Sequence, residues 1–88
     1  MDEVCFVRKE GRRTSVVTPD GSYWTYAPFG EVVRSMQPYI FLCHSRLGVN
    51  LSRLVLIRKD ALVFPGGLTA SLGRTARQRT KKAWMQTR

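Results

Sequence analysis

The segment 41–54, FLCHSRLGVNLSRL, contains the side chains of this sequence that are best suited to chemistry. Cys43 and His44 are adjacent, Arg46 follows them, and apolar residues surround all three. A cysteine with a histidine can ligate a metal ion or act as an activated nucleophile, whereas a histidine with an arginine can bind an acidic partner. Three kinds of site are therefore compatible with this segment, namely a metal site, a catalytic thiol and an anion-binding surface.

Metal binding and thiol catalysis both need side chains that converge, and this spacing does not supply them. A structural zinc site needs four ligands, whereas the whole chain has one histidine and two cysteines. Neighbouring side chains of an extended segment point to opposite faces, so Cys43 and His44 should diverge. The sequence PGG at 65–67 lacks the Lys and Ser/Thr of a phosphate-binding loop. We therefore expect no enzymatic activity, no metal, no cofactor and no small-molecule substrate.

The charge of the chain favours an acidic partner. Fifteen Lys and Arg against six acidic residues give a formal charge of +9 in 88 residues. So large an excess on a small domain is typical of nucleic-acid binding. The apolar content of 43% indicates a folded domain rather than a disordered polyelectrolyte. The basic residues concentrate in three groups, which are Lys9 with Arg12 and Arg13, His44 with Arg46, and Arg74, Arg77, Arg79, Lys81 and Lys82.

The chain should form a single domain over residues 1–88, with a core at 1–73 and a basic segment at 74–88. We expect a mainly β, antiparallel domain with one short central helix, because the apolar spacing at 29–36 is helical and ends before Pro38. The sequence PDG at 19–21 predicts a hairpin turn. The basic segment could be a helix or a frayed tail. Alternating or β-branched runs predict strands at 4–8, 14–18, 22–26, 49–51, 54–58, 61–64 and 68–72.

The two-residue alternation of an extended chain predicts which side chains of residues 41–51 point inward and which point outward. His44 and Arg46 should project outward, with Ser45 at the bend. A second interpretation of His44 is a partly buried side chain that ties down its loop. Asn50 can bond to the backbone and fix a turn. The side chains that can pack inward are Phe41, Cys43, Leu47, Val49 and Leu51.

The sequence also predicts the cellular compartment of the chain and the chemical state of its two cysteines. No run of about 18 apolar residues exists, so we expect no membrane span. The start, MDEVCF, lacks the basic and apolar regions of a secretory signal, so the chain should be cytoplasmic with reduced thiols. The default for Cys5 and Cys43 is a buried, inert thiol. Cys43 is also a redox candidate, because His44 and Arg46 nearby could lower its pKa.

The segment IFLCHSRLGVNLSRLVLIRKDALVFPGG resembles the signature region of LytTR-type DNA-binding domains, with matching positions at His44, Val49 and Asn50. EVCFVRKEGRRTSVVTPDGSYWTY is similar to the beginning of that family, which has a strand, a basic loop, a strand, a turn and a strand. FGEVVRSM resembles the short helix of the family, and ASLGRTARQRTKKAW resembles its closing strand, Ser/Arg loop and terminal helix. The resemblance covers nearly the whole chain and is to a short, stand-alone form that lacks the first strands.

The resemblance implies an elongated, mainly β domain that inserts loop side chains into successive major grooves of double-stranded DNA. Arg13 with Arg12, Ser45 or Arg46 beside His44, and Arg74 occupy the three contact loops. The implied function is that of a small, sequence-specific transcriptional regulator. Charge and resemblance together predict a DNA-binding set of Lys9, Arg12, Arg13, His44, Ser45, Arg46, Arg74, Arg77, Lys81 and Lys82.

Two other functions are compatible with the same residues. The chain could be a partner module that pairs through a strand edge, as a homodimer or as a heterodimer with a related regulator, and modulates it. It could also be a small β-barrel that binds RNA, with bases stacked on Tyr23, Trp24, Tyr26 and Trp84. A simpler alternative to RNA binding is that Tyr23, Trp24 and Tyr26 form a half-buried strand face.

Overall fold

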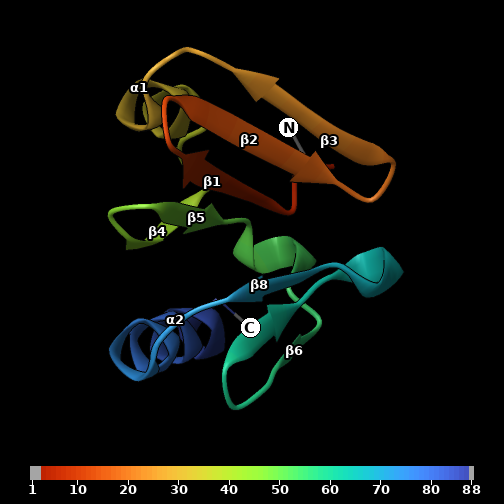
Figure 1. Cartoon of the computed structure of the whole chain (residues 1–88). Helices are drawn as coiled ribbons and strands as arrows, with labels where there is room; N and C mark the ends of the chain where they lie inside the picture. Colours follow the sequence, from red (N-terminus) through yellow and green to blue (C-terminus); the bar gives the residue numbers. More distant parts are fainter. Residues whose placement is uncertain (1–2, 88) are drawn as a thin grey trace.

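Residues 3–87, the part of the computed structural model that can be described, form two antiparallel sheets and two α-helices (Figure 1). The larger sheet has the spatial order β3–β2–β1–β5–β4, and the smaller sheet has the order β6–β7–β8. The predicted mainly β, antiparallel architecture is confirmed, with a mild elongation of 31 × 25 × 22 Å. The strands are β1 (Phe6–Glu10), β2 (Arg13–Thr18), β3 (Gly21–Thr25), β4 (Phe41–His44), β5 (Leu47–Val49), β6 (Leu56–Ile57), β7 (Ala61–Val63) and β8 (Thr69–Ser71). The helices are α1 (Phe29–Ser35) and α2 (Arg74–Gln86), with 3-10 turns η1 (Leu51–Arg53) and η2 (Pro65–Gly67).

The first three strands form a continuous antiparallel meander. β1 and β2 pair as far as Glu10↔Arg13, so Gly11 and Arg12 alone form the turn. Gly11 has a φ of +61° and Arg12 a negative φ, which is the pattern of a type II′ hairpin turn. The hairpin predicted at 19–21 is confirmed, since β2 and β3 pair around it. This short hairpin geometry fixes the direction of the basic turn.

The β4–β5 hairpin extends the sheet beyond β1. β5 pairs antiparallel with β1, with Gly48 opposite Val7. The pairing of β4 with β5 shifts register between Leu42 and His44, so Cys43 is the extra residue of a β-bulge. A bulge turns the neighbouring side chains relative to regular alternation, and here it directly precedes the β4–β5 turn.

The strand expected at 49–51 is wrong in position. The strand is Leu47–Val49, and Leu51–Arg53 forms a 3-10 turn instead. Asn50 causes the change, because its side-chain Oδ1 accepts a hydrogen bond from the backbone N–H of Ser52 at 3.1 Å and caps the turn. The predicted role of Asn50 in bonding the backbone is thereby confirmed. The three later strands lie within their predicted ranges but are shorter.

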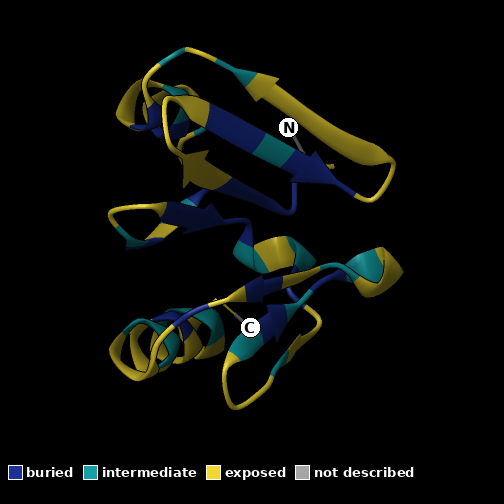
Figure 2. Ribbon diagram, viewed as in Figure 1, coloured by how far each residue is buried: buried dark blue, intermediate teal, exposed yellow. Residues whose placement is uncertain are grey.

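The five-stranded sheet is the middle layer and buries apolar side chains on both faces (Figure 2). On one face it packs against α1, as the apolar spacing of that helix predicts. On the other face it packs against the small sheet and α2, where the rings of Phe6 and Phe64 lie 5.3 Å apart. The core against α1 consists of Val4, Val7, Phe29, Val33 and Ile40. The core against the small sheet includes Cys5, Phe6, Cys43, Leu47, Val49, Leu62, Phe64 and Leu72.

The predicted strand at 4–8 would place Val4 and Phe6 on one face and Cys5 and Val7 on the other, but the two residues before β1 depart from this alternation. Val4 instead shares the α1 core with Val7, and Cys5 shares the other core with Phe6. The strand begins only at Phe6, so the two-residue period does not extend back to these positions.

The aromatic residues of β3, and Tyr26 just after it, are exposed, which corrects the prediction of a half-buried strand face. Tyr23, Trp24 and Tyr26 are 62%, 54% and 69% exposed. β3 is an edge strand, and α1 packs over β1 and β2 rather than over β3. No layer in residues 3–87 therefore covers these rings, and Figure 2 shows most of β3 as exposed.

The basic segment 74–88 contains a helix, α2, over residues Arg74–Gln86. One side of this helix packs on the core through Ala76, Thr80 and Trp84, and Thr80 is completely buried. This apolar stripe at helical spacing explains why the segment folds as a helix rather than as a tail. None of the helices in residues 3–87 has the length and apolar character needed to cross a membrane.

Candidate nucleic-acid interface

Three segments that carry cations lie along one side of the domain. The β1–β2 turn, the β4–β5 turn and the beginning of α2 all lie on the left side in Figure 1. A backbone hydrogen bond joins the first two segments, since the N–H of Lys9 donates to the carbonyl of Arg46 at 2.9 Å. We use the name basic edge for six exposed residues of these three segments. Its members are Lys9, Arg12, Arg13, Ser45, Arg46 and Arg74.

Aromatic rings support the β1–β2 turn. The Cζ atom of Arg13 lies 4.9 Å from the centroid of the Trp24 ring, and the Trp24 ring meets the Tyr26 ring edge to face at 5.2 Å. An arginine stacked on an indole keeps its guanidinium edge available for hydrogen bonds while losing rotamer freedom. The exposed rings of β3 therefore orient Arg13, a role that the pattern of the sequence did not indicate.

The acid nearest to this turn is already engaged. Glu10 accepts hydrogen bonds from the hydroxyl of Ser15 and from Arg8, and its carboxylate lies 3.0 Å from the Arg8 guanidinium. The Ser15 hydrogen bond is the main cause that holds the pKa of Glu10 below its usual value, with Arg8 adding to it. Among residues 3–87, no ion pair involves Lys9 or Arg12. Their charges are thus available to an outside anion.

The β4–β5 turn is closed by the side chain of His44. His44 pairs with Leu47, so Ser45 and Arg46 form a two-residue turn. The Nδ1 atom of His44 accepts a hydrogen bond from the backbone N–H of Arg46 at 3.1 Å. This geometry agrees with the second interpretation of His44, as a half-buried residue that ties down its loop. A DNA contact from His44 stays a prediction.

The predicted DNA-binding residues on α2 differ in their exposure to solvent. Arg74 is the first residue of the helix and is exposed at the basic edge. Lys81 and Lys82 are exposed further along the helix. Arg77 is half-buried, and its Nε is buried without a hydrogen-bond partner in residues 3–87. Of the predicted residues on α2, Arg77 is therefore the least suited to an outside contact.

Arg79 was left out of the predicted DNA-binding set, although it fixes α2 against the large sheet. Its Nη1 donates to the carbonyl of Cys43 at 3.2 Å, and its Cζ lies 5.4 Å from the centroid of the Phe41 ring. Arg79 thus holds the helix next to the strand that leads into the β4–β5 turn. The signal for this role is its place beside Thr80, at the margin of the apolar stripe of α2.

The arrangement of these elements matches a solved structure. A solved chain described as the LytTr DNA-binding domain of a methyl-accepting/DNA response regulator from Bacillus cereus superposes on this chain with a TM-score of 0.75. The match covers 96% of this chain and 82% of that chain, at 13% sequence identity. The chain has the LytTR fold. No family model matches the sequence, and no curated protein matches it.

Within this LytTR fold, Cys43 does not have the surroundings of a redox sensor. The thiol is 1% exposed and accepts a hydrogen bond from the Thr80 hydroxyl at 3.0 Å. Burial raises the pKa of the Cys43 thiol, and this outweighs the opposing effects of Thr80 and Arg79. The expected lowering by His44 and Arg46 is therefore wrong in direction. The Cys43 side chain packs in the core against the small sheet.

Both cysteines should be inert in the folded protein. Cys5 is also buried, and burial raises the pKa of its thiol. We expect Ellman's reagent to react with Cys5 and Cys43 only as fast as the protein opens, because the reagent needs an accessible thiolate. The measurement compares the reaction in buffer with the reaction in denaturant, and Cys43→Ser assigns each phase. A fast native phase that disappears in Cys43→Ser would restore the redox hypothesis.

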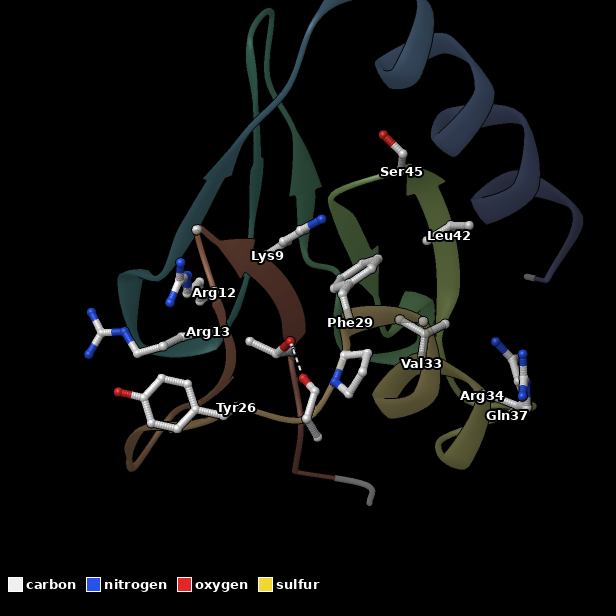
Figure 3. Close-up of a pocket in the computed structure, with 15 residues that line it drawn as sticks. Lys9, Arg12, Arg13, Tyr26, Phe29, Val33, Arg34, Gln37, Leu42 and Ser45 are labelled. Carbon is white, nitrogen blue, oxygen red and sulfur yellow. Dashed lines mark hydrogen bonds between the residues drawn. The ribbon is translucent and has the colours of Figure 1, made fainter.

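A groove of about 850 Å³ adjoins the basic edge (Figure 3). It lies between the β1–β2 turn, the connection from β3 to α1, α1 itself and the β4–β5 hairpin. Phe29 and Val33 of α1 and Leu42 of β4 contribute apolar surface, and Lys9 and Arg34 contribute cations. Sequence patterns could not predict this groove, because its residues come from four separate segments.

Proposed function

We propose that this chain binds double-stranded DNA through its basic edge, as a sequence-specific module of transcription regulation. The observation that supports this most is the placement of cations on three segments along a single side of the domain. The similar solved chain is described as a DNA-binding domain, and the shared fold adds to the proposal. The excess of positive charge, +9 in 88 residues, agrees with a polyanionic partner.

In this proposal, the arginines of the basic edge read base edges in the major groove. A guanidinium donates two parallel hydrogen bonds to O6 and N7 of guanine, and each such pair discriminates by about 1–3 kcal/mol. We assign this role to Arg13, Arg46 and Arg74, one from each segment. Ser45, next to Arg46, is placed for a base or a phosphate contact, and His44 supports their turn.

The lysines and the remaining arginine bind phosphates. Lys9 and Arg12 flank the first reading residue, and Lys81 and Lys82 lie along the exposed side of α2. Contacts of this kind fix the position of the protein on the duplex and supply affinity without sequence preference. Arg77 has at most a minor part, since its stem is half-buried.

Rigid support of the reading residues strengthens the proposal. Arg13 is stacked on Trp24 at 4.9 Å, and the turn of Arg46 is closed by His44 at 3.1 Å. A side chain that is ordered before binding loses less entropy in the complex. Both supports come from the same large sheet, so the spacing of Arg13 and Arg46 is set by the fold rather than by the ligand.

A second candidate function is binding of single-stranded nucleic acid. The exposed rings of Tyr23, Trp24 and Tyr26 favour it, since bases stack on such surfaces at about 1–3 kcal/mol each. The rings lie beside the basic edge through the Arg13–Trp24 contact. Pairing with a second protein through the exposed edge of β3, as a homodimer or heterodimer, stays a prediction.

The decisive measurement is a fluorescence-polarisation titration of the chain with duplex DNA, single-stranded DNA and RNA. Arg13→Gln, Arg46→Gln and Arg74→Gln should each weaken duplex binding about tenfold, since each loses a charge-assisted contact to a base. The matched control is Arg34→Gln, which removes the same charge from an exposed residue of α1 outside the basic edge. It should change the affinity by less than about twofold, because exposed charges away from the contact are screened by salt.

Each result separates the candidates. Equal losses in all four variants would mean that only net charge matters and would contradict the assignment of the basic edge. Preference for single strands, lost in Trp24→Leu, would favour the second candidate. Absence of nucleic-acid binding would leave protein pairing, which sedimentation of the same preparation detects.

A further inference from the structure

We propose that the groove next to the basic edge is a binding site for a small hydrophobic carboxylate, a ligand with one anionic group on an aromatic or aliphatic body. The groove has a volume of about 850 Å³. Pockets of roughly 300–1,000 Å³ are typical for small molecules. The groove adjoins the basic edge and shares Arg13 with the arginines that read bases.

The floor of the groove is apolar and is partly exposed. Phe29 and Val33 reach it from α1, and Leu42 reaches it from β4, where its side chain is 39% exposed although it is aliphatic. Tyr26 and Pro28 line the same space from the connection between β3 and α1. Apolar surface left open beside polar residues gains free energy when a hydrophobic body covers it.

The rim of the groove is cationic. Lys9, Arg12 and Arg13 stand on the side of the β1–β2 turn, and Arg34 stands on α1, on the opposite side in Figure 3. The lining, which comes from residues 3–87, contains no carboxylate. Glu10, the acid of the hairpin, is bound to Ser15 and Arg8 instead. An apolar floor with cations on two sides is complementary to a hydrophobic body that carries a single negative charge.

The anionic group has polar partners besides the cations. Ser45 lines the groove and is exposed, so its hydroxyl can donate a hydrogen bond to a carboxylate. Gln37 also lines the groove, and its amide has a second N–H besides the one that it donates to the carbonyl of Ile40 at 2.9 Å. A neutral hydrophobic ligand would leave this rim without a counter-charge. The complementarity therefore selects an acid over an alcohol or a hydrocarbon of the same shape.

The position of the groove implies competition with DNA, and this part of the inference rests on the proposed function. Lys9, Arg12, Arg13 and Ser45 belong both to the groove and to the basic edge. A bound carboxylate neutralises a cation that the duplex also needs. Duplex and ligand should therefore weaken each other by the same factor, as linkage requires.

The direct test is an amide NMR titration of the chain, without DNA, using 1-naphthoate as the probe. Its neutral isostere, 1-naphthalenemethanol, is the matched ligand control. Naphthoate should shift the amides of Phe29, Leu42 and Ser45 and bind at least about fivefold more tightly than the alcohol, because the cations favour the carboxylate. Equal binding of the two ligands, or shifts confined to other segments, would overturn the proposal.

Two arginine variants separate this proposal from DNA binding. Arg34→Gln, in the groove but outside the basic edge, should weaken naphthoate about fivefold and leave duplex affinity within about twofold. Arg74→Gln, in the basic edge but outside the groove, should do the reverse. Leu42→Gln should also weaken naphthoate, through loss of apolar floor.

The final arm adds naphthoate to the duplex titration. A lower duplex affinity in the presence of naphthoate, with a smaller reduction in Arg34→Gln, supports competition at this groove. If naphthoate binds in the NMR titration but leaves duplex affinity unchanged, the competition is wrong while the site stands. If the chain binds no duplex at all, the NMR titration still decides whether the site exists. If neither binding nor competition is seen, the proposal is wrong irrespective of DNA.

Discussion

Raising the salt concentration from about 50 to about 200 mM is expected to lower the affinity for duplex DNA about a hundredfold, if each of the four phosphate-binding residues neutralises one phosphate. Each cation that binds a phosphate releases a counterion, so the logarithm of affinity falls linearly with the logarithm of salt. Lys9 and Arg12 of the basic edge and the exposed Lys81 and Lys82 of α2 supply these four contacts. The measurement is the duplex dissociation constant at four or five salt concentrations.

The phosphate-binding residues should set this slope. Lys81→Gln with Lys82→Gln should reduce it by about two, because two counterions fewer are released, and should leave the preference for a specific sequence intact. Arg34→Gln should leave the slope nearly unchanged, since it lies outside the basic edge. A wild-type slope near zero would contradict phosphate binding, and a slope unaffected by the double variant would remove α2 from the interface.

Local sequence rules predicted most of the fold, since each rule acts over a few residues. The PDG turn at 19–21, the apolar face of α1 and the capping by Asn50 are determined by neighbours in the chain. The three groups of cations were likewise visible as clusters in the sequence. Their placement on one side of the domain was an expectation from resemblance, and it depends on how the strands pair.

Long-range packing produced the differences. The rings of β3 are exposed because that strand ends at the edge of the sheet, which no local pattern encodes. The raised pKa of Cys43 follows from its burial under α2, where Thr80 reaches its sulfur from 37 positions away in the chain. The roles of Arg79 and of the groove depend on the same contacts between distant segments.

Gly48 is a further position whose identity is set by a distant neighbour. It is buried in β5, and a Cβ atom added there would lie 2.6 Å from Cγ2 of Ile40. Ile40 is itself 3% exposed and packs in the core against α1, so it has little room to move. We expect Gly48→Ala to lower the free energy of unfolding by about 2 kcal/mol, as over-packed cores typically do. Urea denaturation monitored by circular dichroism measures this loss.

Gly30 offers the matched control, because it lies in α1 with open space around its Cα. Gly30→Ala should raise the free energy of unfolding by up to about 1 kcal/mol, since alanine favours the helix. Ile40→Ala alone should be destabilising through the cavity it leaves, yet combined with Gly48→Ala it should cost at least about 1 kcal/mol less than the sum. Additive effects would mean that the Ile40 contact does not exclude a side chain at position 48. A coupled pair would instead show that Ile40, which packs in the core against α1, excludes a side chain at position 48.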